Sequence, residues 1–199
     1  MIRKVALRGA VAGLVAGAVV GGLAVGGWAL RGEMNEAAVE HAMANGGYVI
    51  YLRHAERQSG PKETFSAETP LADFSDCRGQ RNLTPAGRNE AVRIGRSFQS
   101  LGVPIGEVFA LPLCRTRETA RLAFGSAVLE TRLYDTGFVG RMLAEQPSAG
   151  TNTVLVDTED QVRRLAGIEL QPGEAAVFEP DGKGGFRYNG TLDQDDLIR

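Results

Sequence analysis

The chain has 199 residues, of which 43% are hydrophobic, so it is long enough to bury the core of one domain. Its 22 basic and 24 acidic residues give a net charge of −2, but residues 1–31 hold four of the basic residues and no acidic one. The remainder is therefore acidic by about six charges. This balance argues against nucleic acid or an anionic lipid surface as its main partner.

The N-terminal segment, residues 1–31, has the pattern of a membrane anchor or of a secretory signal. Positions 9–30 carry no charge, and at about 1.5 Å per residue a helix of that length crosses a bilayer core. Three basic residues precede it, which by the positive-inside rule keeps the N-terminus in the cytoplasm: Arg3, Lys4 and Arg8. A retained anchor and a cleaved signal both remain open, and both place the domain outside the cytoplasm, as a membrane-anchored, periplasmic or secreted protein.

The same segment carries glycines at four-residue spacing, which predicts a close helix–helix contact and hence a homodimer through Gly13, Gly17 and Gly21. A segment that is merely rich in glycine and alanine is the commoner explanation of such spacing, and both interpretations stay open.

Cys77 and Cys114 form an even pair, which fits either one disulfide in an oxidising compartment or two reduced, buried thiols. A structural zinc site normally needs four ligands, which these two cysteines do not supply, so we expect no metal.

The following chain divides into a connector helix at 32–47, a domain at 48–192 and a frayed tail at 193–199. Residues 33–44 are rich in alanine, methionine and glutamate, and glycines end this helix, on which His41 is expected to be a surface or packing residue. The apolar run 48–52 then predicts a buried strand that ends in Arg53 and His54.

Strand and helix patterns alternate through the domain. Residues 58–81 are polar, contain two prolines and have no sustained period, so they predict a lid over the site. The elements expected beyond the lid are helices at 85–101, 115–124 and 158–167, strands at 107–111, 128–133 and 153–156, and a hairpin of 174–179 with 185–188. This order predicts an α/β fold, a three-layer αβα sandwich with a mostly parallel sheet and helices on both faces.

The residues at two strand ends suit phosphoryl transfer through histidine. Such chemistry needs an imidazole nucleophile, cations for the phosphoryl oxygens and a proton donor for the leaving alcohol. His54 would be the nucleophile, while Arg53 and Arg115 would bind phosphate through their planar guanidinium groups. For the acid, Glu56 and Glu118 are candidates, although a salt bridge with a neighbouring arginine explains either carboxylate as well.

Three ordered motifs, at 52–56 (LRHAE), 80–87 (QRNLTPAG) and 111–120 (LPLCRTRETA), resemble the histidine phosphatase superfamily, which includes the phosphoglycerate mutases. The resemblance covers roughly residues 48–178. It implies a phosphohistidine at His54, a phosphate cradle of Arg53, Arg115 and Arg81, and no cofactor. The exported arrangement is also similar to small periplasmic phosphatases that act on lipopolysaccharide heptose.

The chain departs from this family at its second histidine and at Leu111, where the family commonly has a serine. The family has a second histidine after a hydrophobic strand, and here the corresponding residue after 154–157 is Thr158, which suits a helix cap. Loss of one such charge-stabilising group typically lowers the rate by about 10² to 10³. The neighbouring carboxylate of Asp157 would repel phosphate if it faced the pocket.

Two functions therefore follow from the sequence. The first is a phosphomonoester hydrolase, impaired or specialised by Thr158, that acts on a phosphorylated small molecule or glycan. The alternative is a catalytically inactive, membrane-tethered pseudophosphatase that binds a phosphorylated ligand or a protein partner. The lid sequence contains nothing that indicates a mutase.

Overall fold

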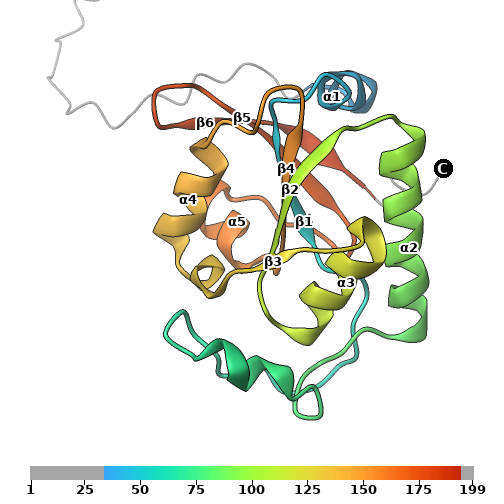
Figure 1. Cartoon of the computed structure of the whole chain (residues 1–199), viewed down its shortest axis with the longest axis vertical. Coiled ribbons are helices and arrows are strands. Elements are labelled where there is room, and N and C mark those ends of the chain that lie inside the picture. Colours follow the sequence, from blue (N-terminus) through green and yellow to red (C-terminus); the bar gives the residue numbers. More distant parts are fainter. Residues whose placement is uncertain (1–33, 194–199) are drawn as a thin grey trace, which may run out of the picture. The chain divides into compact units, whose positions relative to one another are not determined.

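The computed structural model describes residues 34–193, in which six strands form one mixed sheet between two layers of helices (Figure 1). The strands are β1 (Val49–Arg53), β2 (Ile105–Ala110), β3 (Val128–Leu129), β4 (Asn152–Asp157), β5 (Ala175–Pro180) and β6 (Phe186–Leu192). Their order is β3-β2-β4-β1-β5-β6, and β1 to β4 run parallel. The predicted hairpin adds β5 and β6 by antiparallel pairing. The α/β fold with helices on both faces is thus confirmed.

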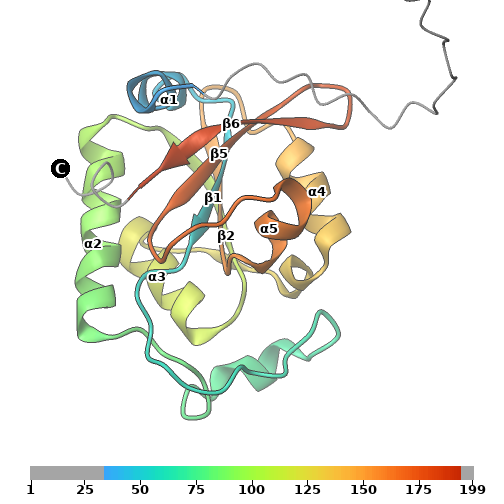
Figure 2. The same cartoon turned by 180° about the vertical axis from the view of Figure 1, so that it is seen from behind.

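The helices divide between the two faces of the sheet, as Figures 1 and 2 show from opposite sides. One face is covered by α1 (Glu36–Met43), α2 (Pro85–Ser100) and α3 (Cys114–Phe124), and the other by α4 (Thr136–Ala144) and α5 (Asp160–Ala166). Strand β1 contributes to the hydrophobic core on each face of the sheet. Ile50 and Leu52 pack on the face covered by α1, α2 and α3, while Val49 and Tyr51 pack on the face covered by α4 and α5. This alternation of side chains is what a strand buried on both faces requires.

Helix α2 forms as its sequence predicts. The Thr84 side chain caps it by accepting a hydrogen bond from the Gly87 backbone N–H at 2.9 Å, and Pro85 occupies the first helical position. Its buried stripe packs against α3, where a side chain on Gly95 would place Cβ 2.2 Å from the carbonyl oxygen of Ala123. The two helices therefore approach closely only because residue 95 has no side chain.

Two short 3₁₀ helices, η1 (Leu71–Ser75) and η2 (Thr131–Tyr134), complete the elements, and η2 corrects the strand expected at 128–133. Only Val128 and Leu129 extend the sheet, because the Glu130 side chain accepts a hydrogen bond from the Arg132 backbone N–H at 2.9 Å and starts the 3₁₀ turn. Helix α4 was not predicted, since its two glycines, threonine and valine have low helix propensity.

Helix α5 begins at Asp160, so the predicted cap at Thr158 is wrong. The capping box does not form, because Gln161 uses its side chain elsewhere: it accepts from the Thr136 hydroxyl and donates to the Tyr134 carbonyl. The helix does end at Gly167, which has the left-handed conformation, with φ of 68°.

The expected anchor at 1–31 and the tail beyond Asp193 lie outside the described residues. Within residues 34–193, no helix combines the length and the apolar character that crossing a membrane requires.

The close packing of α2 on α3 gives a test with an internal control. We expect Gly95→Ala to lower the free energy of unfolding by about 1–3 kcal/mol, because the added methyl group overpacks the helix contact. In Gly140→Ala the new Cβ would meet only Leu165 Cδ2 at 3.5 Å, so helix propensity should leave this variant about 0.5–1 kcal/mol more stable. Urea unfolding measures both changes, and equal stability of the two variants would refute the packing argument.

Candidate active site

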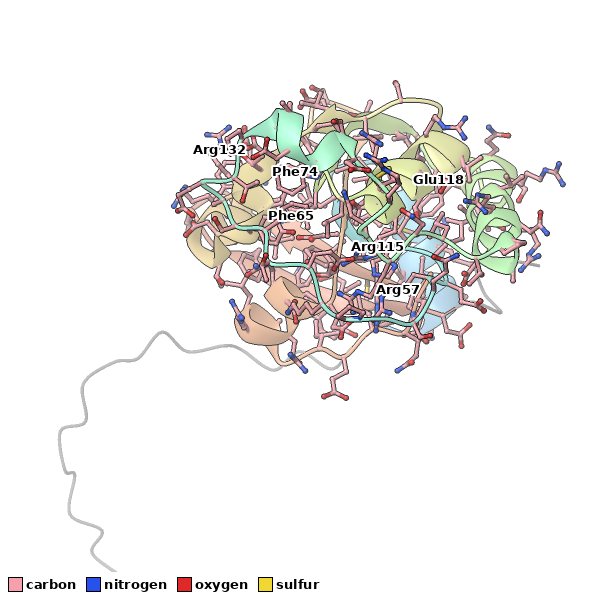
Figure 3. The ribbon with its side chains drawn as sticks, turned by 90° about the horizontal axis from the view of Figure 1, so that it is seen from below. Arg57, Phe65, Phe74, Arg115, Glu118 and Arg132 are labelled. Carbon is pink, nitrogen blue, oxygen red and sulfur yellow. A yellow bond between two sulfur atoms is a disulfide. The ribbon has the colours of Figure 1, made fainter. Side chains whose placement is uncertain are left out.

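A cavity of about 300 Å³ lies where the carboxyl ends of β1 and β4 meet the start of α3. The segment 58–81 passes across this end of the sheet (Figure 1). Figure 3, viewed from that end, shows Arg57 and Arg115 near each other. Six basic and three acidic side chains line the cavity: Arg53, Arg57, Lys62, Arg81, Arg115 and Arg164, with Glu63, Glu159 and Asp160. The structure thus gathers His54 and all three predicted phosphate-binding arginines at one site.

His54 is held in one orientation and in its neutral form. The residue is 1% exposed, and its Nδ1 lies 2.8 Å from the carbonyl oxygen of Ala55. Because a carbonyl only accepts, Nδ1 carries the proton, which leaves Nε2 with a free lone pair. Burial, together with the positive charge of Arg115, lowers the pKa of His54 to about 3. The imidazole is therefore neutral and has one nucleophilic nitrogen at physiological pH.

Arg53 and Arg115 make their contacts through the terminal nitrogens of their guanidinium groups. Arg53 contacts the Glu159 carboxylate at 2.5 Å and donates to the Leu170 carbonyl, and Arg115 donates to Glu63 at 2.9 Å. The Nε of each arginine is buried and has no hydrogen-bond partner among the described residues. Since buried donors are nearly always satisfied, two orphaned guanidinium donors beside His54 fit a site for an acceptor-rich ligand.

Glu63 is the central residue of the site that the sequence did not reveal. Its carboxylate accepts from the Arg81 guanidinium and from the Arg81 backbone N–H, both at 2.7 Å, as well as from Arg115. Burial by itself would raise the pKa of Glu63, but the hydrogen bonds from Arg81 outweigh it and lower the pKa to about 2. The only signal was that 58–81 was predicted to be a lid, without any motif that would single out one residue.

Arg57 and Lys62 were also missed. Arg57 lines the cavity three residues after His54, and burial followed by the charge of Arg81 lowers its pKa. Lys62 forms an ion pair with Asp160 at 2.9 Å across the cavity. The position of Arg57 directly after the Arg-His-Ala-Glu motif was a signal that sequence reasoning could have used.

The two carboxylates expected to act as acids do not line this cavity. Glu118 binds Arg88 of α2 at 2.8 Å, and Figure 3 shows it on the side of α2. Glu56 accepts from the Thr84 hydroxyl at 2.6 Å and faces a separate hollow of about 520 Å³. Glu118 therefore has the arginine salt bridge that was its alternative explanation, whereas Glu56 bonds a hydroxyl group instead.

The position of the missing histidine is occupied by Thr158, which lines the cavity, whereas Asp157 turns into the protein. The Asp157 carboxylate accepts from the Thr158 backbone N–H at 2.6 Å and lies 3.0 Å from the Tyr51 hydroxyl. That hydroxyl is also 2.7 Å from the Thr158 carbonyl oxygen. Tyr51 has one hydroxyl hydrogen, and the Thr158 carbonyl can only accept it. Both contacts of the Tyr51 hydroxyl are therefore hydrogen bonds if Asp157 is protonated and donates to the Tyr51 oxygen. Burial accordingly raises the pKa of Asp157 to about 7.

Cys77 and Cys114 form a disulfide, which decides between the two states that the sequence allowed. The bond joins the end of the lid segment to the first residue of α3, next to Arg115. The Arg117 guanidinium lies 3.4 Å and 3.6 Å from the two sulfur atoms. The lid is thus covalently fixed at one end to the element that carries the buried arginine.

The buried carboxyl of Asp157 predicts a pH dependence of stability. Its pKa is above the ordinary 3.8 in the folded state, so the folded protein holds the proton more tightly and stability falls as pH rises from about 4 to about 7. A neutral amide avoids this loss, and we expect Asp157→Asn to be more stable than wild type above pH 7, by at most about 4 kcal/mol.

Urea unfolding across this pH range measures the difference between Asp157→Asn and wild type. Asp73→Asn, at an exposed position of η1, should retain the wild-type pH slope. A slope unchanged by Asp157→Asn would show that this carboxyl is not protonated in the folded state.

Comparison with solved structures finds the same architecture in phosphatases. The structure of the protein histidine phosphatase SixA complexed with tungstate aligns with a TM-score of 0.55 and 16% identity, covering 75% of this chain and 99% of that chain. A putative phosphohistidine phosphatase SixA from Nakamurella multipartitia aligns with a TM-score of 0.51 and 17% identity, covering 73% and 95%. No protein-family model and no curated protein matches the sequence. The chain has the histidine phosphatase fold, as its three motifs predicted.

Proposed function

We propose that the chain is a phosphomonoester hydrolase that passes the phosphoryl group through Nε2 of His54. The observation that carries this proposal is the neutral, buried imidazole, oriented by Ala55, beside two arginines with unsatisfied Nε donors. The apolar segment at 9–30 would hold the domain at a membrane and outside the cytoplasm, a location that the disulfide favours.

The reaction needs two displacements at phosphorus. In the first, the Nε2 lone pair of His54 forms the N–P bond while the ester P–O bond breaks and its electrons leave with the alcohol oxygen. In the second, water attacks the phosphohistidine, inorganic phosphate leaves and the neutral imidazole returns. Arg53, Arg57 and Arg115 would stabilise the charge on the phosphoryl oxygens in both steps.

Proton delivery to the leaving oxygen is the weak point of this site. Thr158 offers only a hydroxyl, Glu63 is ionised at neutral pH, and burial raises the pKa of Tyr134 above that of an ordinary tyrosine, so that it is a very weak acid. A leaving group that is stable as an anion needs no proton in the transition state. The site therefore suits aryl phosphates and similarly activated phosphoryl compounds better than alkyl phosphates.

Hydrolysis of p-nitrophenyl phosphate by the full-length chain tests the nucleophile. We expect His54→Ala to lower the turnover by about 10³ or more, because no other imidazole lines the cavity. His41→Ala is the matched control, since it removes the chain's other histidine from an exposed position of α1 and should leave the rate unchanged. Hydrolysis that survives His54→Ala would eliminate the proposed mechanism.

Restoring the missing histidine tests the proton-delivery argument. We expect Thr158→His to raise turnover of an alkyl phosphate by about 10² to 10³ and to raise that of p-nitrophenyl phosphate much less. Parallel kcat measurements on the two esters give the ratio. An equal gain for both, or none, would show that the leaving-group proton does not limit the reaction.

A non-catalytic phosphate-binding module is the second candidate. Its supporting observation is that Thr158 replaces a catalytic group while Glu63 and Glu159 occupy three of the arginines. This function predicts binding of inorganic phosphate without hydrolysis of any ester by the wild-type chain. Such a protein would bind a phosphorylated ligand or protein partner rather than turn it over.

A further inference from the structure

We propose that Glu63 is the resident anion of the phosphate site, which a ligand must displace and which thereby selects dianionic phosphoryl groups over monoanions. The inference rests on the proposed phosphate site and deepens it, because it names a residue that sets which anions can enter.

The contacts of Glu63 imitate those of a bound anion. Its carboxylate oxygens accept from Nε and Nη2 of Arg81, from the Arg81 backbone N–H and from Nη1 of Arg115. Such forked, charge-assisted contacts are the ones that guanidinium groups make with phosphate oxygens. Glu63 comes from the lid segment rather than from the sheet edge that carries Arg53 and His54.

The groups at the inner end of the cavity are covered while Glu63 is in place. The Glu63 side chain is 4% exposed, that of Arg115 is 3% exposed, and His54 is equally buried. A phosphate ester that reaches His54 has to contact Arg115, and Glu63 already occupies Nη1 of this arginine. A phosphate that takes over Nη1 of Arg115 therefore requires the carboxylate to leave.

The lid segment is built so that Glu63 can leave without loss of the fold. Between Arg57, whose backbone bridges to Leu83, and η1, the described chain forms no helix or strand. Lys62 is 68% exposed and is held by its one ion pair with Asp160. The disulfide at Cys77 fixes the far end and Phe65 packs on Phe74, so a displacement confined to residues 58–64 leaves Arg81 and Arg115 in position.

Charge decides which ligands can make the exchange. A carboxylate ligand has the same charge and shape as the Glu63 carboxylate, and it also loses translational freedom on binding, so it gains nothing by replacing a tethered group. A phosphate monoester brings about −1.5 to −2 charge and three acceptor oxygens at pH 7, enough to satisfy the Nε donors of Arg53 and Arg115 as well.

Calorimetric titration of the full-length chain with inorganic phosphate and with acetate tests the exchange. In Glu63→Gln the competitor has lost its charge, so phosphate should bind about tenfold tighter or more, and acetate, which is too weak to displace Glu63 in the wild type, should become a measurable ligand. Glu68→Gln is the matched control: Glu68 lies in the same segment, is exposed, and its carboxylate contacts Ser66. This variant should bind as the wild type does.

A second measurement uses the unaltered protein, in case Glu63→Gln fails to fold. Trypsin cuts after Lys62, and displacement of Glu63 should expose this bond, whereas Lys183 in the exposed β5–β6 turn serves as an internal reference. Saturating phosphate should accelerate cleavage after Lys62 several-fold relative to cleavage after Lys183. Slower or unchanged cleavage at Lys62 would overturn the exchange.

The titrations also separate this inference from the proposed function. If wild type and Glu63→Gln bind phosphate equally, or the variant binds it more weakly, Glu63 supports the arginines rather than competes for them, and the phosphate site stands. If neither protein binds phosphate, the phosphate site is refuted together with the role of Glu63.

Discussion

The candidate active site depends on one ionic arrangement, in which two arginines, Arg81 and Arg115, share the buried carboxylate of Glu63. Placing a guanidinium group in a protein interior costs several kcal/mol unless an opposite charge compensates it. Among the residues that the structure describes, Arg115 has one carboxylate partner, bound through Nη1, and its buried Nε has no acceptor. A buried arginine with an unsatisfied donor attracts an anion, and in the protein without a ligand this anion is the Glu63 carboxylate. The site is therefore both formed and occupied before a ligand arrives.

The fold explains how these charges come together. Parallel pairing of β1 with β4 places Arg53 opposite Asp157 at the same sheet edge, and α3 begins beside it with Cys114 and Arg115. The disulfide to Cys77 then fixes the lid end against α3. The side chains of the site come from different parts of the sequence, and they meet at the carboxyl edge of the sheet. An immobile sheet edge with a mobile cover is a common way to close a site against water.

The parts of the site that were predictable from sequence are local ones. The strand that ends in Arg53 and His54 and the helix that opens beside Arg115 have strong patterns of their own, so their positions follow from strand and helix periodicity. Glu63 was not predictable, because its segment has no period and its place depends on a disulfide and on two distant arginines. The expected cap at Thr158 failed for a similar reason, since tertiary partners from the end of η2 and the start of α4 bind the side chain of Gln161. Contacts between distant segments decided both outcomes.

The central claim is that phosphoryl groups bind at His54 in place of the Glu63 carboxylate. A crystal structure of the full-length chain soaked with tungstate, a phosphate analogue, tests it most directly. The account predicts tungstate beside Nε2 of His54 and in contact with Arg115, with the Glu63 carboxylate withdrawn from Arg81 and Arg115. Tungstate bound elsewhere, or bound at His54 while Glu63 still bridges both arginines, would contradict it.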